Sequence, residues 1–153
     1  MKKLAIIFVF FALTQNVFAG EIFYAETNAA LSTNSAAPVD FPGLTVTIPA
    51  WSYRPKNALV TVNIPSPFAI GYDFPGGVFL VAVNGVIQNN AAAGVFTYSQ
   101  RNPESYSRIP VTLVTKVALP AENQAATIQV KWYGIRNSTV KVDSQTSLSV
   151  QLF

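Results

Sequence analysis

Apolar and polar residues alternate with a period of two through most of the chain after its first twenty residues. The alternation is clearest over 44–48, 59–64, 127–133 and 147–152. A period of two places every second side chain on one face of a β-strand, whereas a helix requires a period of 3.6. Residues 78–83 are nearly all apolar, which is typical of a strand covered on both faces. The chain is therefore predicted to fold from strands.

Turn residues separate these apolar runs at intervals of about 8–12 residues. Asn84-Gly85 lies between two of them and predicts a type I′ hairpin, because both central residues of that turn need positive φ. Residues 25–37 are rich in Asn, Ser and Thr and are interpreted as a loop. Further strands over 94–98, 109–119 and 140–142 bring the total to about eight to ten, which predicts an all-β, two-sheet β-sandwich.

The N-terminal residues have the pattern of a cleaved secretory signal. Lys2 and Lys3 precede an apolar run over 4–13, and Val17-Phe18-Ala19 supplies the small or β-branched residues that a signal peptidase reads. That run would span only about 15 Å as a helix, about half of a bilayer core, which disfavours an uncleaved anchor. We expect a signal peptide over 1–19, one β-sandwich domain over 20–153, and a secreted or periplasmic location.

Removal of this signal changes the charge of the domain. The whole chain has ten basic and seven acidic side chains, a net charge of +3, and removal of Lys2 and Lys3 leaves a net charge of +1. That value gives no reason to expect nucleic-acid or anionic-membrane binding. The chain has no Cys and no His, which excludes disulfides, thiol catalysis and thiolate or imidazole metal sites.

Three stretches resemble bacterial and phage domains of the tumour-necrosis-factor-like (complement-head-like) jelly-roll superfamily. Val39–Ile48 reads VDFPGLTVTI, like the opening of those domains, and Leu80–Gly85 reads LVAVNG, like their hairpin. Ala126–Trp132 and Ser147–Val150 are similar to their closing strands. The resemblance implies a ten-stranded jelly roll that commonly trimerises and serves recognition or adhesion, and it implies no catalytic residue.

A small outer-membrane barrel is an alternative, because the chain ends in Phe153. A lipid-facing band needs apolar residues at the positions in phase with that aromatic residue. Those positions hold Gln151, Ser149 and Ser147, so the pattern disfavours a barrel.

Residues for catalysis or metal binding are sparse. The acids are scattered without a D-x-D or E-x-x-E cluster, and the chain has no His to activate a Ser or Thr nucleophile. Asp40 and Asp143 flank predicted strands and could join carbonyls around calcium, although turn capping is the commoner role of such residues. No catalytic residue, metal or cofactor is therefore predicted, and a His-free hydrolase remains an alternative.

Three predicted loops combine aromatic side chains with polar or cationic ones, the composition of a glycan-binding or protein-binding surface. The candidate ligand-binding residues are Trp51, Tyr53, Arg54, Tyr72, Asp73, Tyr98, Arg101 and Tyr106. The alternative is that these aromatics close the ends of the sandwich or pack between subunits. Trp132 is in phase with Ile128 and Val130 and is predicted to lie in the core, and Asn137-Ser138-Thr139, a glycosylation sequon, is interpreted as a turn.

The sequence as a whole predicts a secreted bacterial module that binds or adheres without catalysis, recognising a glycan or a protein surface. Its expected partner is itself, as a homo-oligomer such as a homotrimer, with no nucleic acid and no integral membrane association after processing. The alternative is a pilus-like structural subunit that assembles by strand exchange, for which Glu21–Thr27 is the candidate strand.

Overall fold

The computed structural model describes residues 20–71, 74–96, 108–143 and 145–153. Every regular element in these ranges is a β-strand. The strands are β1 (Ile22–Thr27), β2 (Leu31–Thr33), β3 (Val39–Ile48), β4 (Asn57–Ile64), β5 (Pro67–Ile70), β6 (Gly76–Val83), β7 (Val86–Phe96), β8 (Val111–Ala118), β9 (Ala126–Ile135), β10 (Thr139–Val142) and β11 (Thr146–Leu152). No helix in the described ranges is long and apolar enough to cross a membrane.

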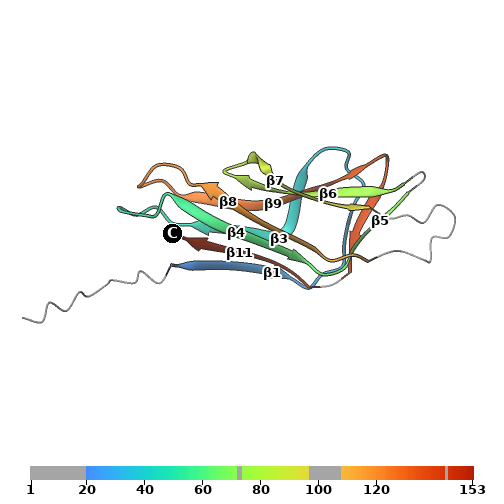
Figure 1. The fold of residues 1–153 in the computed structure, drawn as a ribbon, viewed down its shortest axis with the longest axis horizontal. Helices are drawn as coiled ribbons and strands as arrows, with labels where there is room; N and C mark the ends of the chain where they lie inside the picture. Colours follow the sequence, from blue (N-terminus) through green and yellow to red (C-terminus); the bar gives the residue numbers. More distant parts are fainter. Residues whose placement is uncertain (1–19, 72–73, 97–107, 144) are drawn as a thin grey trace, which may run out of the picture.

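The strands form two four-stranded antiparallel sheets and a short third sheet (Figure 1). One large sheet has the order β1-β11-β4-β8, the other has the order β3-β9-β6-β7, and the short sheet is β2-β10-β5. When the eight strands of the large sheets are numbered in chain order, the sheets read 1-8-3-6 and 2-7-4-5. This arrangement is that of an eight-stranded jelly roll. The predicted two-sheet jelly roll is confirmed.

The core lies between the two large sheets and consists of the inward-facing residues of each strand. In β8, for example, buried and exposed residues alternate without a break. The ring of Trp132 lies at its centre, with ring centroids 4.5 Å from Phe41 and 6.2 Å from Phe79. Trp132 is 2% exposed, which confirms its predicted core position.

Two tight turns connect strands that follow one another in the chain, and each has two successive residues with positive φ. Asn84 and Gly85 have φ of 48° and 80°, as the predicted type I′ hairpin between β6 and β7 requires. Arg136 and Asn137 have φ of 55° and 56°, and their turn leads the chain from β9 in a large sheet to β10 in the short sheet. The sequon at Asn137 therefore begins in a turn, as interpreted from the sequence.

The structure differs from the sequence prediction at the start of the domain, because 25–37 is not one continuous loop. It contains the end of β1 and all of β2, which pair with β11 and β10. Both strands are only partly buried, and the residues that they contribute to 25–37 are few and mostly small or polar. Pairing with distant strands, and not local composition, makes this segment extended.

A second difference concerns β5 and β7. The strand β5 starts at Pro67, in a stretch for which the sequence predicted no strand, and Pro is tolerated at the first residue of a strand. The strand β7 runs without interruption from Val86 to Phe96, with an irregular register opposite Leu80 and Ala82 of β6. The Asn-rich residues between its two apolar parts form this irregularity.

Candidate functional site

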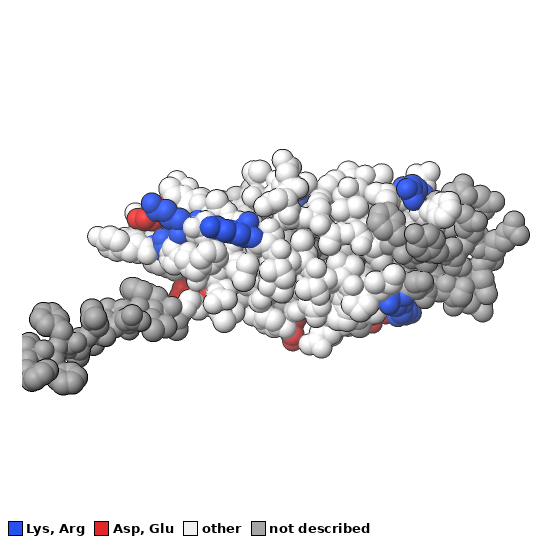
Figure 2. Space-filling view, viewed as in Figure 1, with Lys and Arg blue, Asp and Glu red and all other residues white. Residues whose placement is uncertain are grey.

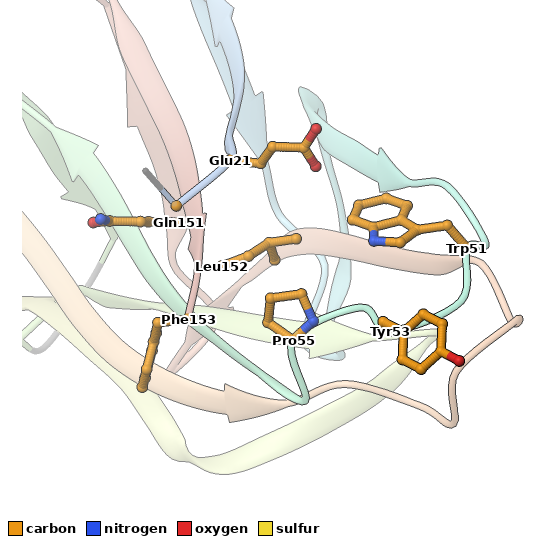
Figure 3. Close-up of a pocket in the computed structure, with 8 residues that line it drawn as sticks. Glu21, Trp51, Tyr53, Pro55, Gln151, Leu152 and Phe153 are labelled. Atoms are coloured by element: carbon orange, nitrogen blue, oxygen red, sulfur yellow. The ribbon is translucent and has the colours of Figure 1, made fainter. Parts of the chain in front are cut away.

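A hollow of about 610 Å³ opens at the end of the sandwich where the chain terminates. Its walls come from the segment before β1, the β3–β4 loop and the last residues of the chain. The lining residues are Gly20, Glu21, Trp51, Tyr53, Pro55, Gln151, Leu152 and Phe153. Figure 3 shows Leu152 and Pro55 between Phe153 on one side and Trp51 and Tyr53 on the other, with Glu21 beside Trp51.

The β3–β4 loop, residues 49–56, contributes the two aromatic rings that the sequence predicted for a site. Tyr53 is 92% exposed and its backbone is left-handed, with φ of 61°. Trp51 is half-buried and stacks on Phe23, with ring centroids 6.4 Å apart and planes 26° apart. One ring is therefore free for a ligand, and the other forms part of the wall.

Arg54 occupies a different position from the exposed, ligand-facing one that the sequence suggested. Its side chain is buried, and its guanidinium donates to the carbonyl oxygens of Gln124, Pro120 and Ala121 at 2.6, 2.8 and 3.3 Å. These carbonyls belong to the β8–β9 loop, residues 119–125. Arg54 thus joins two loops beneath the surface, and its donors are directed away from solvent.

The end of the chain is held against both neighbouring strands. The amide of Leu152 donates to the Glu21 carbonyl at 3.0 Å, and the amide of Phe153 donates to the Asn57 carbonyl at 3.2 Å. The ring of Phe153 remains 57% exposed, and the ammonium of Lys116 lies 5.3 Å from its centroid. The second aromatic side of the hollow is therefore fixed by backbone hydrogen bonds.

The chemistry of the hollow is that of a binding surface. Aromatic faces flank it, the Gln151 amide offers donors and an acceptor, and Glu21 supplies a carboxylate. Within the described ranges, no group of three or more acidic residues could hold a metal ion. Asp40 pairs with Lys131 at 2.5 Å and Asp143 pairs with Arg108 at 2.6 Å, so each of these carboxylates has a cationic partner.

The sequence-predicted residues fall into three groups. Trp51 and Tyr53 meet at the hollow, while Arg54 lies beneath their loop. Five predicted residues lie outside the described residues, namely Tyr72, Asp73, Tyr98, Arg101 and Tyr106.

Sequence reasoning did not assign Glu21, Gln151 and Phe153 to the site. No local pattern could have done so, because these residues come from opposite ends of the chain and meet only through the pairing of β1 with β11.

The comparisons with known proteins agree with this architecture. No curated protein sequence matches the chain. Among solved structures, dimeric latent PorU from Porphyromonas gingivalis is similar over 88% of this chain, with a TM-score of 0.50 and 13% identity, and this chain spans only 13% of that protein. Eiger TNF from S. frugiperda matches over 86% of this chain and 92% of its own, with a TM-score of 0.44 and 11% identity. The PorU likeness supports the fold alone.

Residues 28–151 match the family described as the N-terminal domain of Bc2l-C. The match begins just after β1 and runs nearly to the end of β11, so it includes every strand of the two large sheets except β1. It also includes Trp51, Tyr53, Pro55 and Gln151 of the hollow. The chain belongs to the Bc2l-C N-terminal domain family, and its domain is a TNF-like jelly roll.

Proposed function

We propose that this protein is a non-enzymatic glycan-binding module and that the hollow at the end of the sandwich is its site. The exposed ring of Tyr53, held on a braced loop at the wall of that hollow, is the observation that carries the proposal. A sugar ring has apolar C–H faces that pack on aromatic rings, while its hydroxyls need donors and acceptors nearby. Membership of a family of TNF-like jelly-roll binding domains supports the same conclusion.

The charge of the lining restricts the class of glycan. Glu21 is the acidic residue of the lining, and no Lys or Arg is among the residues that line the hollow. A carboxylate repels sialylated, sulfated or phosphorylated sugars and accepts hydrogen bonds from hydroxyls or from an amino group. Neutral and amino-bearing sugars are therefore the expected ligands.

An array of immobilised oligosaccharides tests the proposal. We expect the wild-type domain to be retained on neutral or amino-bearing glycans and Tyr53→Ala to lose at least tenfold in retention. Tyr133→Ala is the matched control, because Tyr133 faces outward on β9, in the other large sheet. Equal retention of wild type and Tyr53→Ala, or no retention of the wild type on any glycan, would contradict this function.

We further propose that copies of the domain associate through the outer face of the β1-β11-β4-β8 sheet. Strand pairing places the outward residues of this sheet in three rows that cross its four strands. The middle row consists of Tyr24, Ser149, Thr61 and Val114. Tyr24, Val114 and Ile22 expose more than half of their side chains on this face. Figure 2 shows that Lys and Arg side chains gather toward the two ends of the molecule, and that the surface between them is mostly uncharged.

Charge also favours association of copies through this face. In the three rows that strand pairing defines, the charged residues are Glu26, on β1, and Lys116, on β8. They belong to opposite edges of the sheet, because β1 and β8 are its outer strands. An edge that carries an acid can therefore meet an edge that carries a base when identical copies pack around an axis.

Strand exchange is less well supported than binding. It requires an unpaired terminal strand, whereas Ile22–Thr27 pairs along its whole length with β11 of the same chain, from Ile22 with Gln151 to Thr27 with Thr146. The edge of the sheet is therefore already completed by the segment that would be donated.

We also propose that the protein is exported and that residues 1–19 are removed, as the basic and apolar N-terminal residues suggest. N-terminal sequencing of protein recovered from the periplasm or medium should begin at Gly20. Recovery of the intact Met1 terminus from the cytoplasm would contradict it.

A further inference from the structure

Arg54 is placed unusually for an arginine. Its side chain is 2% exposed, although arginine is almost never fully buried without a charged partner. The described residues place only backbone carbonyls on its guanidinium, those of Pro120, Ala121 and Gln124. A buried charge held only by carbonyl dipoles is costly to keep, so its position calls for a specific role.

The three carbonyls belong to a loop that strand pairing leaves partly unsatisfied. Residues 119–125 lie between β8 and β9, begin beside Pro120 and contain Asn123 with φ of 66°. Buried carbonyl groups outside a ladder need other donors. The planar guanidinium has five N–H donors in a fixed arrangement and reaches carbonyls at both ends of this loop. A lysine ammonium on its flexible side chain is less suited to bind several carbonyls at once.

The β3–β4 loop is tied to the same partner on both sides of Arg54. The amide of Asn123 donates to the Trp51 carbonyl at 3.4 Å, and the hydroxyl of Ser52 donates to Asn123 Oδ1 at 3.1 Å. Beyond Arg54, the amide of Leu119 donates to the Lys56 carbonyl at 2.9 Å. The two loops therefore form one braced unit, with Arg54 at its buried centre.

Tyr53 is the residue of this unit that most needs support. Its φ of 61° lies in the left-handed region that non-glycine residues seldom adopt, and its 92% exposed ring gains almost nothing from packing. Such a conformation persists only when its surroundings determine it. On either side of Tyr53, Ser52 and Arg54 are both anchored to the β8–β9 loop by hydrogen bonds. Pro55 adds to this restriction, because its ring limits the backbone conformations of Arg54.

We propose that Arg54 is a positioning residue that acts through Tyr53. By fixing the β8–β9 loop against the β3–β4 loop, it holds the Tyr53 ring at the hollow before a ligand arrives. Less conformational entropy is then lost on binding than with a mobile loop. The inference rests on the proposed glycan site for its binding consequence, whereas the bracing of the two loops can be tested without any ligand.

The test compares Arg54→Met and Arg54→Lys with the wild type. Arg136→Met is the matched control, because Arg136 also donates to a loop carbonyl, that of Phe74 at 3.1 Å, but from an exposed position in the β9–β10 turn. Amide hydrogen exchange is measured over 50–56 and 119–125, and retention is measured on the same neutral oligosaccharide array.

We expect Arg54→Met to accelerate exchange at least tenfold at the amides of Leu119 and Asn123, which donate to carbonyls of the β3–β4 loop, while the amides of β4, β9 and β11 stay protected. We expect retention to fall at least tenfold in Arg54→Met, to recover partly in Arg54→Lys and to stay unchanged in Arg136→Met. Wild-type exchange rates in both loops of Arg54→Met would overturn the proposal. If Arg54→Met does not fold, Arg54→Lys becomes the deciding variant. Exchange rates and glycan retention equal to those of the wild type in Arg54→Lys would show that the planar guanidinium is not needed to hold the two loops, and would overturn the proposal.

The two proposals fail in different ways. If the wild type is retained on no glycan, the proposed function fails, while the exchange measurement still decides whether Arg54 braces the two loops. If Arg54→Met loosens both loops and the glycan is retained as before, positioning of Tyr53 by Arg54 is wrong and the glycan site stands.

Discussion

Trp51 and Tyr53 lie two residues apart on one loop, and different forces hold them. Trp51 stacks on Phe23 and packs against the core, whereas Tyr53 projects into solvent. Trp51→Ala should lower the free energy of unfolding by about 1–3 kcal/mol, because it removes partly buried aromatic area, and Tyr53→Ala should change it by less than about 0.5 kcal/mol. Urea denaturation followed by circular dichroism measures both values. Equal loss of stability in the two variants would mean that Tyr53 is packed in solution.

Tyr24 gives a pH dependence that belongs to a single side chain. Its hydroxyl donates to Glu26 Oε2 at 2.8 Å, and this bond to a carboxylate raises the pKa of Tyr24 above its ordinary value. A folded-state pKa above the unfolded one means that the bond stabilises the fold below about pH 10 and is lost as the pH rises through the higher folded value. Thermal unfolding between pH 8 and 11.5 should show a steeper decline for wild type than for Tyr24→Phe. Parallel curves for the two proteins would contradict the assignment.

At the level of elements, the turn between β9 and β10 depends on one glycine. A Cβ at Gly134 would lie 2.1 Å from the carbonyl oxygen of Ser138, which is backbone and cannot rotate away. Gly134→Ala should therefore destabilise the fold by at least about 1–3 kcal/mol, as overpacking does. Gly85→Asn is the control, because nothing lies within 4 Å of that position and Asn tolerates its φ of 80°. A denaturation midpoint of Gly134→Ala equal to that of wild type would show that this turn can open without loss of stability.

The strands that sequence could locate are those with one face in the core. In β8 and β9, buried residues alternate with more exposed ones, and the inward residues are mostly apolar because they pack between the sheets, with Thr115 as an exception in β8. The hairpin turn at Asn84-Gly85 could also be predicted from the sequence, because few pairs of residues adopt positive φ at two successive positions. By contrast, β1, β2 and β5 have short or weakly buried faces, and distant partners make them strands.

At the scale of the whole molecule, the exposed face of the β1-β11-β4-β8 sheet can be tested by adding one charge. Val114 is 56% exposed on the edge strand β8, in the middle row of this face, so Val114→Glu should leave the fold of one chain intact and prevent association of copies. Light scattering after gel filtration should give about three times the mass of one chain for wild type, the stoichiometry expected of TNF-like domains, and the mass of one chain for the variant.

Thr47→Glu is the matched control, because Thr47 is exposed on β3, in the other large sheet. It should keep the wild-type mass. A wild type that stays monomeric at high concentration, or a Val114→Glu variant that keeps the assembled mass, would refute association through this face.

The sequence by itself determined the all-β class, the hairpin at Asn84 and the core position of Trp132, because period-two alternation and turn chemistry are local properties of the chain. The jelly-roll type followed from the resemblance of short stretches to a known superfamily. Only the tertiary structure decided that Arg54 is buried and that Glu21 and Phe153, from opposite ends of the chain, meet the Trp51 loop. Pairing of β1 with β11 and of β4 with β11 brings these segments together. Such contacts depend on the register between strands that are far apart in the chain. A short stretch of sequence never contains both of the residues that come into contact, so local patterns cannot predict them.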